Sequence, residues 1–419
     1  MIATALVLAW GMVYYYAGVL LPIREKAPLG AWDVGGYQSD LYPRWLGARE
    51  LLWHHRNPYS REMTEEIELG FYGRPIDAAR RDKVDPEAFA YPAYVAFLLA
   101  PLLPLRFEVA KPVFTAILLL MTVATLPLWV RGMKLRLGWR ATFLAFCAMM
   151  SSYTVVEGLR LGQITLLVSF LMAGSVAALS RGWHLLAGIL LALALVKPQL
   201  CAFLLTFLVV WSVGEWSARK RFAIGFGIVA AMEFVGSELM LPGWFGFWRG
   251  AVVEYIHWHR GSLLTGMLGA RIAPVVTGGL ILVCGILFWG CRTEVVGSTR
   301  FNLAVVSALT ATTIVLPNAG GGSFYNQILL VPVVAWLVTS GGALAKDGPA
   351  RLTWIIASAG LAGEWILAFA VSFAAFALGY HFQNEATAFV GGPEVLMYIL
   401  PLELALFVSS AALPSWRAQ

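Results

Sequence analysis

The sequence predicts an all-α polytopic membrane protein, in which about twelve transmembrane helices form a single domain over residues 1–419. Hydrophobic residues make up 59% of the chain and charged residues only 13%, with a mean hydropathy of +0.73. One soluble core could not bury so much apolar surface. Apolar runs of roughly 17 to 22 residues recur to the C-terminus, the length a helix needs to cross a bilayer. The short alternating segments of a membrane β-barrel are absent from the sequence.

The apolar runs give the expected spans in order, interrupted once by a polar segment over residues 23–107 that we expect to contain amphipathic juxtamembrane helices. The first run lacks a basic leader and a small-residue cleavage site, which favours a retained span over a signal peptide. The run 89–104 is short and bracketed by prolines, so we expect it to be re-entrant or interfacial. The expected spans are 2–22, 108–130, 141–156, 162–180, 183–197, 198–214, 221–241, 271–291, 301–317, 324–340, 351–375 and 394–411.

Charge supports this topology and predicts its orientation. With a cytoplasmic N-terminus, the inner loops receive 13 basic residues against three acidic ones, as the positive-inside rule requires. Counting 89–104 as a crossing would move the basic loop 131–140 outside. The bundle 108–411 would therefore follow a large first extracytoplasmic loop. The other polar clusters, 157–163, the Lys197-Pro198 break, 242–270, 318–327 and 380–389, would share that outer face, which suggests one extracytoplasmic active site.

Several classes of function are disfavoured. The net charge of +6 comes from basic residues in short loops between spans, so nucleic-acid binding is not indicated. The four cysteines lie within or at the ends of apolar runs with no CxxC pair, which supports neither structural zinc nor a disulfide framework. The sequence contains no convincing internal repeat, so the inverted-repeat architecture of many transporters is not indicated.

Asp40 is the main candidate for chemistry in the first loop. It precedes the segment 41–54, where Leu41, Trp45, Ala48 and Leu52 form an apolar stripe suited to lying on the membrane. Aspartate is a preferred helix N-cap, and a carboxylate at this depth could equally act as a general base. Position alone leaves both interpretations open.

Asp33 is the competing base, although an aspartate in a glycine-rich turn needs no catalytic role. The remaining acids of the loop alternate with arginines and indicate a solvated surface.

Lys197 and Arg160 are candidate phosphate partners. Lys197 ends an apolar run next to Pro198, where a lysine costs roughly 3 kcal/mol unless it snorkels or meets an anion. Arg160, followed by Gly162-Gln163, lies at another outer helix junction and could make forked contacts to phosphate oxygens. An interfacial arginine without function is the alternative.

The segment 244–262 interleaves aromatic residues with charged ones, as the aromatic belts at membrane interfaces do. His257 and His259 are two apart and would point away from each other on a helix, which disfavours a metal site. The sequence also contains no Asp-x-Asp motif, so a metal-bound nucleotide-sugar diphosphate is not indicated.

Four blocks of the chain, between about residues 38 and 335, are SDLYPRWLGARELLWHHRNPY, FAYPAYVAFLLAPL, LGQITLLVSFLMAG with LLAGILLALALVKPQL, and LPNAGGGSFYNQILLVPV. In this order they resemble glycosyltransferase family 87, integral membrane enzymes of the C-type superfamily that use polyprenyl-phosphate sugars. The resemblance implies an outward-facing site with Asp40 as the catalytic aspartate. The chain departs from the family pattern at YPAY and YPRW, which leaves the acceptor and the sugar open.

On this resemblance we expect an inverting transferase, with mannose as the expected sugar and a glycan or glycolipid as acceptor. The leaving lipid phosphate is already anionic and needs no proton donor, so one base and some cations suffice, with no metal or other cofactor. Lys197 and Arg160 would stabilise the phosphate. The residues expected to bind the substrate are Arg160, Gln163, Lys197, His257, Tyr325 and Asn326.

Two alternatives belong to other classes. A transporter or flippase of a lipid-linked or polar solute would use intramembrane charges, yet most charges here lie in loops. A noncatalytic assembly subunit would use the polar loop as a docking surface. An Asp40→Asn substitution separates them, because only the enzyme depends on that carboxylate for turnover. The sequence gives no oligomeric state.

Overall fold

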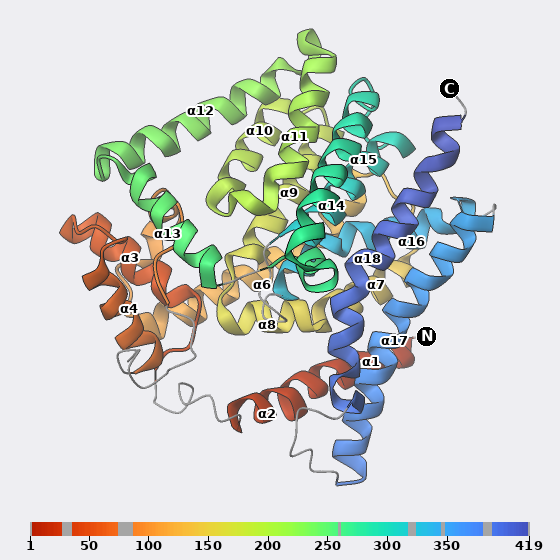
Figure 1. Cartoon of the computed structure of the whole chain (residues 1–419), viewed down its shortest axis with the longest axis horizontal. Helices are drawn as coiled ribbons and strands as arrows, with labels where there is room; N and C mark the ends of the chain where they lie inside the picture. The colour runs from red at the N-terminus through yellow and green to blue at the C-terminus, as the bar shows by residue number, and fades with distance from the viewer. Residues whose placement is uncertain are drawn as a thin grey trace.

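The structure, a computed structural model, describes residues 2–26, 36–73, 87–258, 261–316, 324–344, 348–379 and 388–417. Every regular element in this part of the chain is a helix (Figure 1). The all-α class predicted from the sequence is therefore confirmed.

Six helices in the described residues are long and apolar enough to cross a membrane. The first is continuous from Ile2 to Ile23 through α1 (Ile2–Tyr14), a π-helix η1 (Tyr15–Leu20) and the start of α2 (Leu21–Lys26). The others are α6 (Phe107–Gly132), α12 (Trp216–Met240), α14 (Leu263–Gly290), α17 (Gly348–Ala377) and α18 (Ala388–Arg417). A seventh span would be the pair α7 (Trp139–Ser151) and α8 (Tyr153–Leu161), which is bent by 46°. The chain is thus a multi-pass membrane protein.

Five further apolar segments have only 10–17 residues. They are α9 (Ile164–Ser180), α10 (His184–Leu193) with η4 (Ala194–Val196), α11 (Pro198–Gly214), α15 (Thr299–Val315), and the stretch Phe324–Thr339, which covers η5 (Phe324–Leu330) and the first part of α16 (Val331–Leu344). Each predicted span overlaps one of the helices, but only six or seven reach spanning length. At 1.5 Å per residue, a helix of 10–17 residues is shorter than a hydrocarbon core of about 30 Å.

Two predicted boundaries move because serine caps start helices inside polar or apolar runs. Ser152 Oγ accepts a hydrogen bond from Val155 N and begins α8, so the predicted span 141–156 is broken at that residue. Ser262 Oγ accepts from Thr265 N and starts α14 before residue 271. That helix then kinks at Gly269, whose φ is 75°.

The polar segment after the first span folds into α3 (Leu41–His54) and α4 (Arg61–Tyr72). The bounds of α3 match the predicted helix, but its apolar stripe does not lie on a membrane. Leu41, Trp45 and Ala48 are buried within the protein, and Trp45 contacts the Phe107 ring at 5.4 Å. The interpretation of this stripe as a membrane-facing surface was wrong, because amphipathicity does not specify what covers the apolar side.

The run 89–104 forms only the short helices α5 (Val95–Leu99) and η3 (Ala100–Leu102), and it is not among the candidate spans. Most of its side chains are buried or half-buried, whereas Phe97 is 40% exposed. Tyr94 Oη donates to Leu195 O at 2.9 Å, and Trp248 Nε1 of α13 (Trp244–Trp258) donates to Ala90 O at 3.3 Å.

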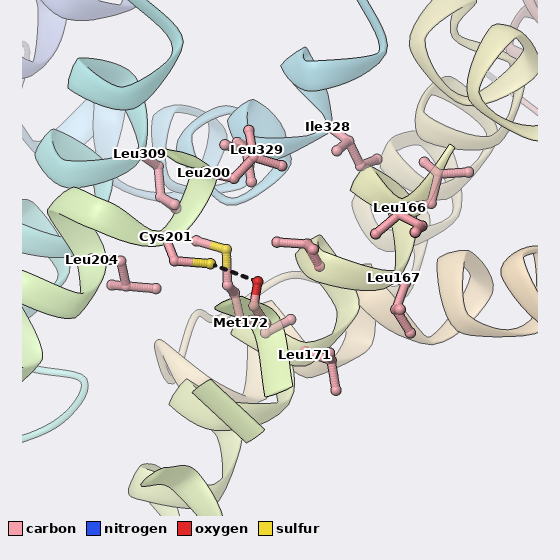
Figure 2. Packing of buried hydrophobic residues seen from close by; sticks show 14 of the residues in the cluster. Leu166, Leu167, Leu171, Met172, Leu200, Cys201, Leu204, Leu309, Ile328 and Leu329 are labelled. Atoms are coloured by element: carbon pink, nitrogen blue, oxygen red, sulfur yellow. Dashed lines mark hydrogen bonds between the residues drawn. The ribbon is translucent and has the colours of Figure 1, made fainter. Parts of the chain in front are cut away.

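The main core joins α9, α11, α15 and η5, with α6 packed against α9. Figure 2 shows this packing, including Leu166, Leu171 and Met172 of α9, Leu200, Cys201 and Leu204 of α11, Leu309 of α15, and Ile328 and Leu329 of η5. The dashed line marks Cys201 Sγ–H donating to Ala194 O at 3.3 Å. This core holds the break at Lys197 and the start of α9 in place, while α17 and α18 pack side by side with α1 against α17 (Figure 1).

Candidate active site

Asp40 occupies the N-cap position of α3, yet its side chain makes no capping hydrogen bond to that helix. Its carboxylate instead accepts a hydrogen bond from Gln163 Nε2, a residue 123 positions along the chain. The half-buried Asp40 side chain is therefore directed to α9 and away from the amides of its own helix. Of the two interpretations left open by the sequence, capping does not describe this carboxylate.

The contact between Asp40 and Gln163 depends on the sharp turn between α8 and α9. Gly162 ends α8 with φ 68°, a left-handed conformation that glycine adopts without strain. A Cβ at this position would lie 3.0 Å from Leu41 Cβ. Ser39 Oγ donates to Leu161 O at 2.9 Å and fastens the start of α3 to the same turn.

Arg44, one helical turn after Asp40, places a buried cation beside the carboxylate. Its side chain is 5% exposed and lies over the Tyr91 ring at 4.2 Å. Nη2 donates to Tyr91 Oη at 2.6 Å and to Gln163 Oε1 at 3.5 Å. Burial raises the pKa of Tyr91, so the phenol stays protonated. Arg44 Nε is buried and has no hydrogen-bond partner among the described residues.

Lys197 supplies a second buried cation at the break between η4 and α11, where it is 7% exposed. Its Nζ donates to Thr165 Oγ1 at 2.8 Å and to Asn326 Oδ1 at 3.3 Å. It also lies 5.1 Å from the Tyr325 ring centroid. In the part of the chain that is described, Lys197 forms no ion pair with a carboxylate.

The start of α9, with its N-cap residue Gln163, joins these two groups of side chains. Gln163 contacts Asp40 and Arg44, while Thr165 donates to Asn326 Oδ1 at 3.0 Å and accepts from Lys197. Asp40 and Arg44 also interact electrostatically with Lys197. The structure thus brings the predicted residues Asp40, Gln163, Lys197, Tyr325 and Asn326 together with Arg44, Tyr91 and Thr165 in what we call the Asp40 cluster.

Arg160 lies at the same turn, but protein groups already bind its guanidinium. Nε donates to Glu157 Oε2 at 3.0 Å and to Tyr16 Oη at 2.6 Å, and Nη2 donates to Glu157 Oε1 at 3.3 Å. Its charge is therefore offset by an ion pair, whereas Lys197 forms no ion pair among the described residues.

Two residues that the sequence marked as site candidates, His257 and Asp33, have side chains outside the described part of the chain. His257 lies in the last turn of α13, and its side chain is outside the described part. Asp33, the competing base, also falls outside the described residues, as does His259.

Three residues of the Asp40 cluster were not predicted from the sequence: Arg44, Tyr91 and Thr165. Arg44 could have been found, because it is four residues after Asp40 and such residues share a helix face. Nothing in the sequence distinguishes Thr165 or Tyr91 from their many neighbours of the same kind. The described residues contain no group of three or more His, Cys, Asp or Glu side chains arranged to hold a metal ion.

Comparison with known proteins identifies a family for this chain. No curated protein and no solved structure matches the chain, whereas the model of glycosyltransferase family 87 matches residues 89–317, more than half of it. That segment contains Tyr91, Arg160, Gln163 and Lys197 but begins after Asp40. Together with the helices of spanning length, the match shows that the chain is a membrane glycosyltransferase and belongs to glycosyltransferase family 87.

Proposed function

We propose that the chain transfers a sugar, expected to be mannose, from a polyprenyl-phosphate donor to a glycan or glycolipid acceptor. Asp40 is the general base, and transfer proceeds with inversion at the extracytoplasmic face of the cytoplasmic membrane. The observation that carries this proposal is the orientation of the Asp40 carboxylate, held by Gln163 beside two buried cations, Arg44 and Lys197.

The proposed reaction is a single displacement at the anomeric carbon. The acceptor hydroxyl loses its proton to Asp40 as its oxygen bonds to the anomeric carbon. The bond from that carbon to the phosphate oxygen breaks, and the electron pair leaves with the lipid phosphate. Because phosphate is a stable anion, one carboxylate meets the proton requirement, in contrast to the two carboxylates of glycoside hydrolysis.

Arg44 and Lys197 are the cations proposed to receive the phosphate. A buried charge is costly, and an incoming anion would offset that cost. The unpartnered Arg44 Nε is a donor suited to a phosphate oxygen. Arg44 takes the place that sequence analysis gave to Arg160, because Glu157 already offsets the charge of Arg160.

Sugar hydroxyls are proposed to contact Gln163, Tyr325 and Asn326, whose amide and phenol groups both donate and accept hydrogen bonds. His257 at the end of α13 is proposed to approach the acceptor. The proposed topology keeps twelve crossings, with the five shorter apolar helices as spans and the basic loops in the cytoplasm.

The test is transfer from radiolabelled polyprenyl-phosphate mannose by purified protein. Asp40→Asn keeps the size of the side chain and removes its basicity, so turnover should fall about 10² to 10⁴-fold. Donor affinity should change little. Glu65→Gln, an exposed acid on α4 of the same polar segment, is the matched control and should transfer normally.

Undiminished transfer by Asp40→Asn would remove Asp40 as the base, and Asp33→Asn measured in parallel shows whether Asp33 takes that role. Loss of donor affinity with unchanged turnover would also contradict the assignment, because a base acts after binding.

A further inference from the structure

Tyr16 lies in the π-helical turn η1 of the first span, before the segment matched to the family. Turns of this kind are rare and frequently occur at functional sites. Here the turn buries two consecutive tyrosines with different partners. Tyr15 Oη donates to Val390 O on α18 at 2.8 Å, whereas Tyr16 contacts α8.

Tyr16 contacts both ends of α8. Its ring meets the Tyr153 ring edge-on at 5.1 Å, in the first turn of that helix. Its hydroxyl donates to the Glu157 carboxylate and accepts from Arg160 Nε at 2.6 Å, in the second half of the helix. Tyr16 is 2% exposed and Glu157 4%. A buried carboxylate needs such partners, so the three side chains form one network that fastens α8 to the first span.

Helix α8 in turn contacts the Asp40 cluster or its chain neighbours at two places, one near each end of the helix. At its C-terminus, the Gly162 turn presents Gln163 to Asp40. Near its N-terminus, Thr154 Oγ1 donates to Phe324 O at 3.1 Å, directly before Tyr325 and Asn326. A rotation of this nine-residue helix would therefore displace both the amide that holds the carboxylate and the residues beside Lys197.

We infer that Tyr16 and Arg160 are positioning residues of the transferase: through α8 they hold Gln163 where it orients the Asp40 carboxylate. The inference rests on the proposed function of Asp40. It means that a residue of the first span, Tyr16, affects the rate of transfer. Arg160 Nε and Nη2 already bond to Tyr16 and Glu157, so we expect the influence of Arg160 on the reaction to pass through α8.

The experiment compares Tyr16→Phe with Tyr15→Phe in the mannose-transfer assay. Each variant loses one buried phenol hydroxyl from the same helical turn. Tyr16→Phe should lower kcat about tenfold and leave the donor KM unchanged, since the loss of hydrogen bonds to charged groups has that magnitude. Tyr15→Phe should keep the wild-type kcat. Should Tyr16→Phe not fold, Arg160→Lys tests the same network, with the same expected change.

A double-mutant cycle with Gln163→Ala separates positioning from general stability. In the Gln163→Ala background, Tyr16→Phe should have little further effect on kcat, because its path to Asp40 is already broken. A tenfold loss in both backgrounds, equal losses in Tyr15→Phe and Tyr16→Phe, or a raised donor KM with unchanged kcat would each overturn the inference. Turnover by Asp40→Asn would reject the proposed function instead, so the two failures are distinguishable.

Discussion

Lys197 illustrates, at the scale of one residue, how burial and chemistry act together. Its Nζ is held by two neutral oxygens, those of Thr165 and Asn326, and faces the Tyr325 ring. These contacts satisfy its hydrogen-bonding capacity in part, and among the described residues no carboxylate forms an ion pair with it. The arrangement suits a site that an anion enters, because the anion supplies the missing charge.

Lys197→Met should therefore weaken donor binding more than it weakens folding. Thr165 and Asn326 remain bonded to each other at 3.0 Å without the lysine, and an unpaired buried charge is removed. We expect about tenfold weaker donor affinity, the magnitude of a lost charge-assisted contact, with a Tm close to that of the wild type. Donor titration and thermal unfolding in detergent measure the two quantities.

Arg219→Met is the matched control for this prediction. Arg219 is also a buried cation, but it donates to the Trp211 and Arg292 carbonyls and lies over the Trp211 ring. Its loss should lower Tm and leave donor affinity intact. Equal donor affinity in Lys197→Met and the wild type, together with a lower Tm, would identify Lys197 as a purely structural residue.

At the scale of the elements, the turn from α8 to α9 matters most for the site, and it contains Gly162. Gly182, in the turn after α9, serves as a comparison. Both glycines have positive φ values, of 68° and 76°. A Cβ at 162 would meet Leu41, whereas a Cβ at 182 would meet nothing within 4 Å. The two glycines therefore share the same conformational requirement and differ in what surrounds them.

Gly162→Ala and Gly182→Ala should each lose about 1 kcal/mol of stability, the cost of a left-handed alanine. Only Gly162→Ala should also lose transfer activity, because its methyl group pushes α3 and Asp40 away from Gln163. Thermal unfolding and turnover measured on both variants test this. Equal transfer activity of the two variants would show that the turn tolerates the methyl group and that turnover does not depend on the contact between Asp40 and Gln163.

At the scale of the whole molecule, charge predicts the orientation in the membrane. The basic loop 131–140 is expected in the cytoplasm and the segment holding α3 and α4 outside. In a Cys147→Ser background, since the other three cysteines are buried, Arg61→Cys should react with a membrane-impermeant maleimide in intact cells. Arg136→Cys should react only after permeabilisation. The reverse pattern would place the Asp40 cluster on the cytoplasmic side.

The local pattern of the sequence determined the helical class, the bounds of α3, the break at Lys197-Pro198 and the set of polar residues worth testing. Each depends on hydrophobicity, proline or charge within a short window. The shift of boundaries at Ser152 and Ser262 also had a local signal in the serine caps.

Only the tertiary structure decided which of these residues meet. The bond from Gln163 to Asp40 spans 123 positions and that from Lys197 to Asn326 spans 129. It also showed that the apolar side of α3 faces protein and that Glu157 offsets the charge of Arg160. Such contacts follow from how distant helices pack, and no spacing along the chain encodes them, because hydrophobic periodicity specifies that a face is covered and leaves open by what.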